Sequence, residues 1–203
     1  MPRKNTVRND EADSFYHVYN RGHNKSEIFL DDSDYRYFEM LLARSLSSKK
    51  SFDKFSRQYS NFNGEVQIHA YCLMSNHFHL LLYQKEQKQI EKFMRSILTA
   101  YTMYFNRKYD RSGSLYESMY KSVLIKNDEQ LRHISRYIHL NPINYRVWDY
   151  GSYSDYMYGT RDWVTTDKIL KIFKTPKLYA DFVDDYVDVK QANNQYSKEI
   201  GDI

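Results

Sequence analysis

The chain has 203 residues, a formal net charge of +4 and one cysteine, Cys72. This length is typical of one domain with a small appendage, and a single cysteine excludes a secreted scaffold built on internal disulfides. The longest apolar runs, such as 80–82, are far shorter than the roughly 18 residues that span a bilayer, and polar residues follow Met1 where a secretory signal has its apolar core. We therefore expect a cytoplasmic protein with no membrane partner.

Aromatic residues make up 17% of the chain, and 21 of them are tyrosines. A tyrosine-rich, slightly basic surface suits the stacking of nucleic-acid bases. The same composition arises when codon bias fills half-buried positions with tyrosine, and composition alone favours this second explanation. The charge of +4 is too small to identify a nucleic-acid-binding protein by itself.

The first third of the chain predicts one strand and one helix. Residues 1–12 are mostly charged or small and are expected to form a flexible basic arm. The aromatic and β-branched residues at 15–20 predict a strand, which stops at the Arg-Gly pair 21–22. Apolar residues at helical spacing over 34–46, preceded by acidic residues, predict a helix. The segment 47–63 has no clear period and predicts a loop.

The middle of the chain predicts a hairpin, the longest helix and another strand. Two apolar segments, 65–74 and 77–83, are separated by only two residues, which indicates a β-hairpin. Apolar residues recur every three or four positions over 89–108 and predict an amphipathic helix. Alternation over 120–126 predicts the next strand.

The last third of the chain predicts mainly helices. A helix begins after Asn127 and ends before Pro142, because proline disfavours helical geometry in the residue that precedes it. Residues 143–163 predict an aromatic loop, and two short helices are expected over 166–173 and 176–187. The order of all these elements predicts an α+β fold, in which helices pack on an antiparallel sheet.

His77 and His79 are the most informative pair in the sequence. Residues two apart on a strand face the same side, so both imidazoles should point one way while Phe78 and Leu80 point the other. Two imidazoles on one face can hold a metal ion between their ring nitrogens. Alone, the pattern is more typical of ordinary strand histidines that are satisfied by hydrogen bonds.

A second group of polar residues recurs at every fourth position on the helix after Asn127. His133, Tyr137 and Asn141 share one edge of this helix, beside its apolar stripe. A phenol and an amide one turn apart can supply a nucleophile and an oxygen ligand to one site. A half-buried tyrosine beside an Asn-Pro helix stop explains the same pattern, and no neighbour in the sequence supplies a base that would activate the hydroxyl.

Together, these two groups of residues resemble the single-tyrosine HUH (IS200-like) transposases, and in particular their REP-associated tyrosine transposase branch. The resemblance covers about residues 14–160, and its specificity comes from several motifs that occur in the same order along the chain. These motifs are Tyr19-Asn20-Arg21-Gly22, the segment 69–82, Tyr101-Thr102-Met103-Tyr104-Phe105-Asn106, Gly113-Ser114-Leu115-Tyr116 and Ser135-Arg136-Tyr137-Ile138-His139-Leu140-Asn141-Pro142.

The resemblance implies an activity and assigns roles to matching positions. In such proteins a divalent cation, Mg²⁺ or Mn²⁺, polarises a phosphate of single-stranded DNA beside a hairpin, and a tyrosine attacks it to form a 5′-phosphotyrosine link before strands are rejoined. The matching positions are the nucleophile, Tyr137, and the metal ligands His77, His79 and Asn141.

The resemblance also implies the domain organisation and a DNA-binding surface. A ferredoxin-like HUH endonuclease domain is expected over 1–160, and a small helical extension over 161–203. The basic residues expected to bind DNA are Arg21 and Lys121 in the matched segments, and Arg95, Arg107, Lys108 and Arg111 elsewhere. The family commonly has an arginine where this chain has Met119, which weakens the expectation for one phosphate contact.

Two alternatives stay open from the sequence. A relative that binds DNA or RNA hairpins as a regulator, without cutting them, would keep most of these motifs, and an α+β domain with ordinary histidines would also fit. Single-tyrosine relatives act as monomers or as homodimers, and no segment of this chain distinguishes the two. The location implied by the resemblance is the bacterial cytoplasm.

Overall fold

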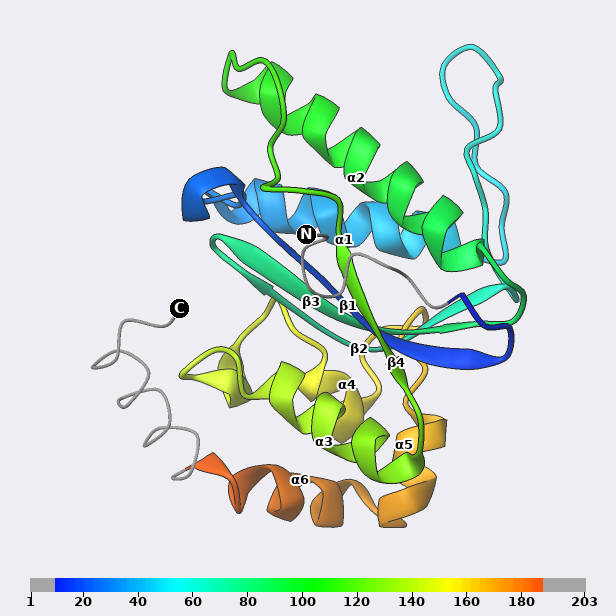
Figure 1. The fold of residues 1–203 in the computed structure, drawn as a ribbon, viewed down its shortest axis with the longest axis vertical. Coiled ribbons are helices and arrows are strands. Elements are labelled where there is room, and N and C mark those ends of the chain that lie inside the picture. Colours follow the sequence, from blue (N-terminus) through cyan, green and yellow to red (C-terminus); the bar gives the residue numbers. More distant parts are fainter. Residues whose placement is uncertain (1–9, 188–203) are drawn as a thin grey trace, which may run out of the picture.

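Four antiparallel strands form the centre of the computed structural model, which describes residues 10–187. The strands are β1 (Ser14–Arg21), β2 (Val66–Met74), β3 (His77–Gln84) and β4 (Lys121–Ile125). Their order in the sheet is β2-β3-β1-β4 (Figure 1). With one helix after β1 and another after β3, this is the ferredoxin-like arrangement, so the predicted α+β fold is confirmed. What the sequence predicts for residues 1–9 and 188–203 lies outside the described residues.

Helices α1 (Asp32–Leu46) and α2 (Gln89–Lys108) cover one face of the sheet (Figure 1). The alternation of the strands supplies this face with completely buried side chains, among them Val18, Leu80 and Leu82. Both helices match their predicted segments. Helix α1 begins two residues earlier than expected, because Asp31 and Asp34 form a capping box ahead of the apolar positions.

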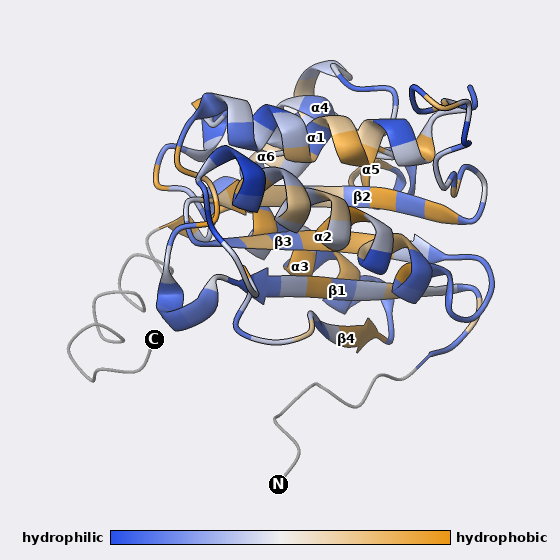
Figure 2. Cartoon of the chain, turned by 90° about the horizontal axis from the view of Figure 1, so that it is seen from above, coloured by the Kyte–Doolittle hydropathy of each residue, from blue (hydrophilic) through white to orange (hydrophobic). Residues whose placement is uncertain are grey.

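Four helices cover the opposite face of the sheet, namely α3 (Asp128–His139), α4 (Tyr153–Tyr158), α5 (Asp167–Phe173) and α6 (Pro176–Asp184) (Figure 1). A second buried cluster joins them to the sheet and includes Ala70, Cys72 and Leu81. Figure 2 shows that β2 and β3 are rich in hydrophobic residues, as expected for strands covered on both faces. None of the helices in the described part of the chain has both the length and the apolar character of a membrane span.

The connections differ from the prediction in three places. The segment 143–163, predicted as a loop, contains a 3₁₀ turn, η2 (Tyr145–Val147), and helix α4. Six residues are too few to show a helical period in the sequence, and α4 is stabilised by packing, with the Tyr156 ring stacked 4.5 Å from that of Tyr179. A further 3₁₀ turn, η1 (His23–Lys25), follows β1, and α6 ends three residues before its predicted end.

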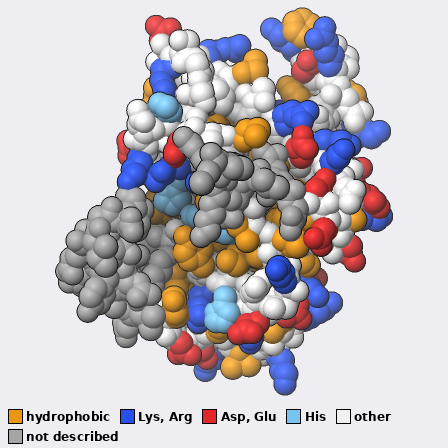
Figure 3. All heavy atoms as spheres, in the orientation of Figure 1, with side chains coloured by type: hydrophobic (Ala, Val, Ile, Leu, Met, Phe, Trp, Pro, Cys, Tyr) orange, Lys and Arg blue, Asp and Glu red, His pale blue; other side chains and the backbone are white. Residues whose placement is uncertain are grey.

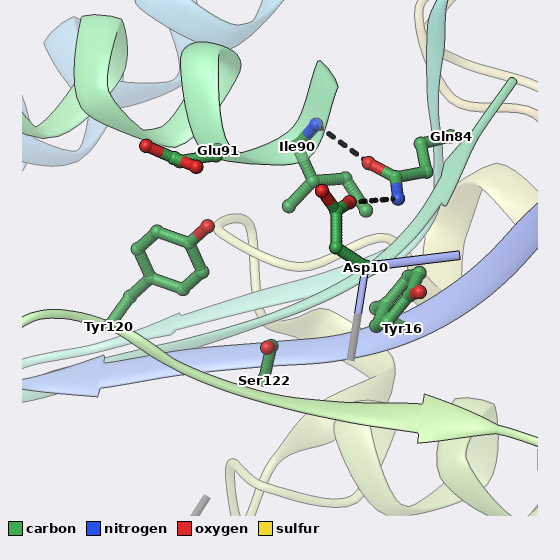
Figure 4. A pocket seen from close by; sticks show the side chains of 7 residues that line it. All are labelled: Asp10, Tyr16, Gln84, Ile90, Glu91, Tyr120 and Ser122. Carbon is green, nitrogen blue, oxygen red and sulfur yellow. Dashed lines mark hydrogen bonds between the residues drawn. The ribbon is translucent and has the colours of Figure 1, made fainter. Parts of the chain in front are cut away.

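The last part of the predicted N-terminal arm is fixed to the sheet. The Asp10 carboxylate accepts hydrogen bonds from Gln84 Nε2 (2.9 Å) and from the backbone N–H of Lys88 (2.8 Å). Gln84 Oε1 in turn accepts from the backbone N–H of Ile90 (3.0 Å; Figure 4). The side chain of Lys88, the residue before α2, makes no capping hydrogen bond. The side chains of Asp10 and Gln84 instead accept two of the backbone N–H groups at the N-terminus of this helix. Residues 10–12 are therefore ordered, contrary to the expectation of a flexible arm over 1–12.

Candidate active site

The face of the sheet beneath α3 carries polar side chains from β1 and β3. The antiparallel register pairs Tyr19 with His79 and Arg21 with His77. Because side chains alternate along each strand, all four lie on the same face. Together with Tyr137 of α3 they line a cavity of about 330 Å³. Figure 3, in the orientation of Figure 1, shows histidine side chains beside Lys and Arg on the exposed surface of the molecule.

Tyr137 lies over the two predicted histidines. Its ring centre is 5.4 Å from that of His79, and the ring centres of His77 and His79 are 5.1 Å apart. The Tyr137 side chain is 42% exposed, so a substrate can reach it from solvent. The structure thus brings together a phenol and two imidazoles that are widely separated in the sequence.

A third histidine, His17 of β1, lies behind His79. His17 Nε2 is 2.9 Å from His79 Nδ1, a distance at which one ring donates a hydrogen bond to the other. Burial lowers the pKa of His17 to about 4, so its ring is neutral at pH 7. If His79 donates through Nδ1, the proton of the neutral ring is on Nδ1 and not on Nε2, which is the tautomer that a metal ligand bound through Nε2 needs. The sequence analysis missed His17; its only signal is its place two residues before Tyr19 on the same strand face.

Hydrogen bonds at the hairpin turn orient the ring of His77. Asn76 Nδ2 donates to the carbonyl of Lys25 (3.3 Å), which leaves Asn76 Oδ1 facing His77 Nδ1 at 2.6 Å. An amide oxygen only accepts hydrogen bonds, so Nδ1 of a neutral His77 carries the proton and Nε2 carries the lone pair. Asn76 therefore orients a candidate metal ligand, a role that the sequence did not predict.

Two cations reach the cavity from the strand ends. Arg21 donates to Glu117 Oε2 from Nε (3.2 Å) and from Nη2 (2.8 Å), which holds its guanidinium in place. Lys121 Nζ lies 5.8 Å from the centre of the Tyr19 ring. Both predicted cations therefore line the same cavity as Tyr137. Glu117 was not predicted, although it directly follows the motif that ends at Tyr116.

Helix α3 is anchored at both ends. Asn127 Oδ1 caps its N-terminus by accepting the backbone N–H of residue 130 (2.9 Å). At the other end, buried His139 has its Nε2 2.8 Å from Ser152 Oγ and its Nδ1 2.7 Å from the Tyr179 hydroxyl. Burial lowers the pKa of His139 to about 3, so the ring stays neutral and can both donate and accept. These bonds tie the last turn of α3 to the loop before α4 and to α6.

Burial also shapes the reactivity of the phenol. Packing against β1 and β3 raises the pKa of Tyr137, because the phenolate is poorly solvated there. The nearby Tyr19 hydroxyl adds to this effect. At neutral pH the hydroxyl is therefore protonated, and any attack by its oxygen has to be coupled to loss of the proton.

Asn141 is not among the residues that line the cavity. Its Nδ2 donates to the backbone carbonyl of Tyr137 (2.9 Å). The Asn141 amide therefore supplies a hydrogen bond to one of the backbone carbonyls that lack a partner within the helix at the end of α3.

The other predicted DNA-binding residues lie elsewhere. Arg95, Arg107 and Lys108 are on α2, and Arg111 follows it, on the face of the sheet opposite α3 (Figure 1). Lys108 Nζ is held at 2.7 Å by the carboxylate of Asp34, whose side chain is completely buried. Lys108 therefore connects α1 to α2.

The donor set suits a divalent cation in part. Within residues 10–187, no group of three or more His, Cys, Asp or Glu side chains is arranged to hold a metal ion. Two imidazoles on one strand face suit a divalent ion whose remaining ligands come from water and from substrate oxygens. The residues present are therefore compatible with a metal that is completed by the phosphate on which the protein acts.

Comparisons with known proteins agree with this geometry. The sequence pattern of the family described as IS200-like transposases matches residues 15–141. A solved structure of a REP-associated tyrosine transposase bound to a REP hairpin has 14% sequence identity and a TM-score of 0.54, over 78% of this chain and 89% of that one. At this identity the likeness shows the fold.

A candidate transposase from Deinococcus radiodurans R1 has 17% identity and a TM-score of 0.40, over 68% of this chain and 95% of the other. No curated protein sequence matches the chain significantly. The family match covers more than half of the chain. The matched residues include His77, His79 and Tyr137, which line the cavity. The chain belongs to the IS200-like transposase family.

Proposed function

We propose that this protein nicks and rejoins single-stranded DNA beside hairpins, with Tyr137 as the nucleophile. The observation that carries the proposal is the position of the Tyr137 ring, 5.4 Å from His79 in a cavity that also contains Arg21 and Lys121. A phenol, two imidazoles and two cations are the groups that phosphoryl transfer to tyrosine requires. The bound REP hairpin of the structural neighbour supports DNA as the partner.

The proposed reaction exchanges one phosphodiester for another. The Tyr137 oxygen attacks phosphorus in line with the 3′ oxygen, the P–O3′ bond breaks, and the proton lost by the phenol ends on the released 3′-hydroxyl. His77 and His79 would hold the Mg²⁺ or Mn²⁺ ion, whose chemistry is to polarise a non-bridging phosphate oxygen. The 5′-phosphotyrosine link conserves the bond energy, so attack by another 3′-hydroxyl rejoins strands without a nucleotide cofactor.

The remaining residues position the strand and the ligands. Arg21, held by Glu117, and Lys121 would bind phosphates on either side of the cut. Asn76 and His17 would orient the two histidine ligands through their Nδ1 atoms.

The test is formation of a covalent adduct. The protein is incubated with a single-stranded hairpin oligonucleotide and Mn²⁺, and the products are separated on a denaturing gel. We expect a protein–DNA adduct that is lost in Tyr137→Phe and in His77→Ala and kept in the control Tyr158→Phe, whose side chain is 81% exposed on α4. The absence of an adduct from a panel of hairpins flanking the gene would reject the proposal.

The same experiment separates the nuclease from a non-cutting regulator. A regulator would bind the hairpin without a metal, so neither EDTA nor Tyr137→Phe would change its affinity or yield any cut product. Tight hairpin binding of this kind, with no adduct, would favour the regulator.

A further inference from the structure

A surface remote from Tyr137 combines exposed aromatic rings with positive charge. It is the loop of residues 47–63, between α1 and β2, which projects beyond the end of the sheet (Figure 1). Phe52 is 57% exposed and Phe55 is 67% exposed. Two phenylalanines this close to a loop tip gain little from packing, so their exposure needs another explanation.

The same segment is strongly basic. The loop has four cations and one carboxylate, a net charge of +3, and Arg44 in the last turn of α1 brings the cations of this region to five. The cations are Arg44, Lys49, Lys50, Lys54 and Arg57. The single carboxylate, Asp53, accepts the backbone N–H groups of Phe55 (2.8 Å) and of residue 57 (2.9 Å). In the part of the chain that the structure describes, none of the recorded ion pairs includes any of the five cations.

The loop has a defined shape of its own. Phe62 at its base is buried in the core, and Asn61 Nδ2 donates to the carbonyl of Ser47 (2.7 Å), which closes the loop. Near the tip, Phe52 and Gln58 form an antiparallel bridge. The exposed rings are therefore presented by a framework of backbone and side-chain hydrogen bonds, which limits the entropy lost when a ligand binds.

Rings and cations alternate along the loop. Lys54 Nζ lies 5.0 Å from the centre of the Phe55 ring, and the Arg57 guanidinium lies 5.9 Å from the same ring. Figure 3 shows hydrophobic side chains among Lys and Arg at the top of the view, where Figure 1 places this loop. A ring with a cation beside it can stack one base and neutralise the phosphate attached to it.

A groove continues from the loop along α2. It has a volume of about 740 Å³ and lies between the loop base, at Ser60 and Asn61, and the outer face of the helix, at Lys92 and Arg95. Arg95, one of the predicted DNA-binding residues, therefore borders this surface although it is not in the tyrosine cavity. Arg95 is paired with Glu91, and Glu65 also lines the groove. Lys92 is therefore the cation of α2 in this groove that a nucleic-acid strand stacked on the loop would meet without breaking a recorded ion pair.

We propose that the loop 47–63 and the adjoining face of α2 form a second binding surface for single-stranded nucleic acid, with bases stacked on Phe52 and Phe55. Strand β2 separates this loop from the turn before His77, and its nine residues span about 30 Å. The surface would therefore bind a part of the nucleic acid that is distant from the reacting phosphate. The inference deepens the proposed function and depends on it only for the identity of the strand as DNA.

The test measures binding apart from chemistry. Fluorescence anisotropy with labelled dT20 is recorded in EDTA and in a Tyr137→Phe background, so that neither a metal nor an adduct contributes. We expect Phe52→Ala with Phe55→Ala to weaken dT20 binding by about tenfold or more, the loss typical of removing one or two stacked bases. The control is Tyr158→Ala, which removes an exposed ring from the other helix layer.

Charge variants test the same surface independently. Replacing Lys49, Lys50, Lys54 and Arg57 by Gln should lower the slope of log K against log salt by about 0.7 for every phosphate contact removed. The control is Lys171→Gln with Lys177→Gln on α5 and α6, and circular dichroism confirms that each variant is folded. Labelled rU20 shows whether the surface distinguishes DNA from RNA.

Two outcomes would overturn the inference. One is unchanged dT20 affinity and salt slope in the loop variants, and the other is equal loss of affinity for a 20-base-pair duplex, which would mean that charge alone is recognised. Failure of the proposed function looks different. In that case no adduct forms with a short hairpin oligonucleotide in the unmodified protein. If the proposed function holds, the unmodified protein and the loop variants all form this adduct, whatever their affinity for dT20.

Discussion

At the scale of single residues, the proposed role of His79 as a metal ligand would depend on its contact with His17. Replacing His17 by Phe removes the partner of His79 Nδ1 at 2.9 Å and frees the ring to rotate or to take the other tautomer. We expect Mn²⁺ affinity, measured by titration calorimetry without DNA, to fall about tenfold to a hundredfold in His17→Phe and less in His17→Gln, which keeps a polar partner. His133→Gln, at an exposed position on α3, is the control. Equal Mn²⁺ affinity in all four proteins would remove His17 from the site.

The sequence was informative wherever a role depends on local spacing. The spacing of two residues on a strand placed His77 and His79 on one face. The spacing of four residues on a helix placed Tyr137 on a polar edge with His133 and Asn141. His17 and Asn76 could not be found in this way, because their roles come from strand register and from a turn contact with Lys25. These are contacts between segments that are far apart in the chain.

At the scale of elements, Lys108 connects the two helices that cover one face of the sheet. Its Nζ is 2.7 Å from the carboxylate of Asp34, which has no access to solvent. Lys108→Met would remove the ion-pair partner of this buried carboxylate, which would keep its hydrogen bonds from the hydroxyls of Tyr104 (3.1 Å) and Tyr109 (2.8 Å). We therefore expect a loss of about 1–3 kcal/mol in the free energy of unfolding, measured with urea. Arg107→Met, at an exposed neighbouring position of α2, should change it by no more than about 0.5 kcal/mol.

DNA affinity distinguishes this structural role from the one predicted by charge. With folded protein, Lys108→Met should bind single-stranded DNA as the unmodified protein does. A variant of full stability that binds DNA more weakly would instead support the DNA-binding role that the sequence predicts for Lys108.

The helices differ in how far their sequences reveal them. Helix α2 was predicted with its observed limits, Gln89–Lys108, because twenty residues show many turns of an apolar stripe. Helix α4 has six residues and is held by burial of its tyrosines, so its sequence reads as an aromatic loop. The capping of α2 by Asp10 and Gln84 likewise depends on segments that meet only in the fold.

At the scale of the whole molecule, three buried histidines make stability depend on pH. Burial lowers the pKa to about 4 for His17 and His69 and to about 3 for His139. In the unfolded chain each histidine has a pKa near 6.5. Between this pH and the lower pKa of the folded protein, the unfolded state therefore binds more protons than the folded state. Stability is therefore full above about pH 6.5 and falls as the pH decreases below it.

The expected size of this effect is about 2 kcal/mol for each histidine between pH 7 and pH 5, since one pKa unit corresponds to about 1.4 kcal/mol. Urea unfolding at the two pH values measures it. His69→Leu removes one titrating ring from apolar surroundings beside Phe15, and should reduce the difference by about a third. A urea midpoint that does not change between pH 7 and pH 5 would show that these rings are protonated in the folded protein.

The anchoring of α3 at Asn127 and at His139 has a consequence for the second half of the proposed reaction. A helix tied to its surroundings by buried hydrogen bonds at its last turn cannot carry a tethered DNA end across the molecule without breaking them. In the proposed reaction, the DNA end attached to Tyr137 would therefore stay in the cavity, and the incoming strand would have to move to it. The geometry of the incoming strand, and how its hairpins fold, would then decide which ends are united.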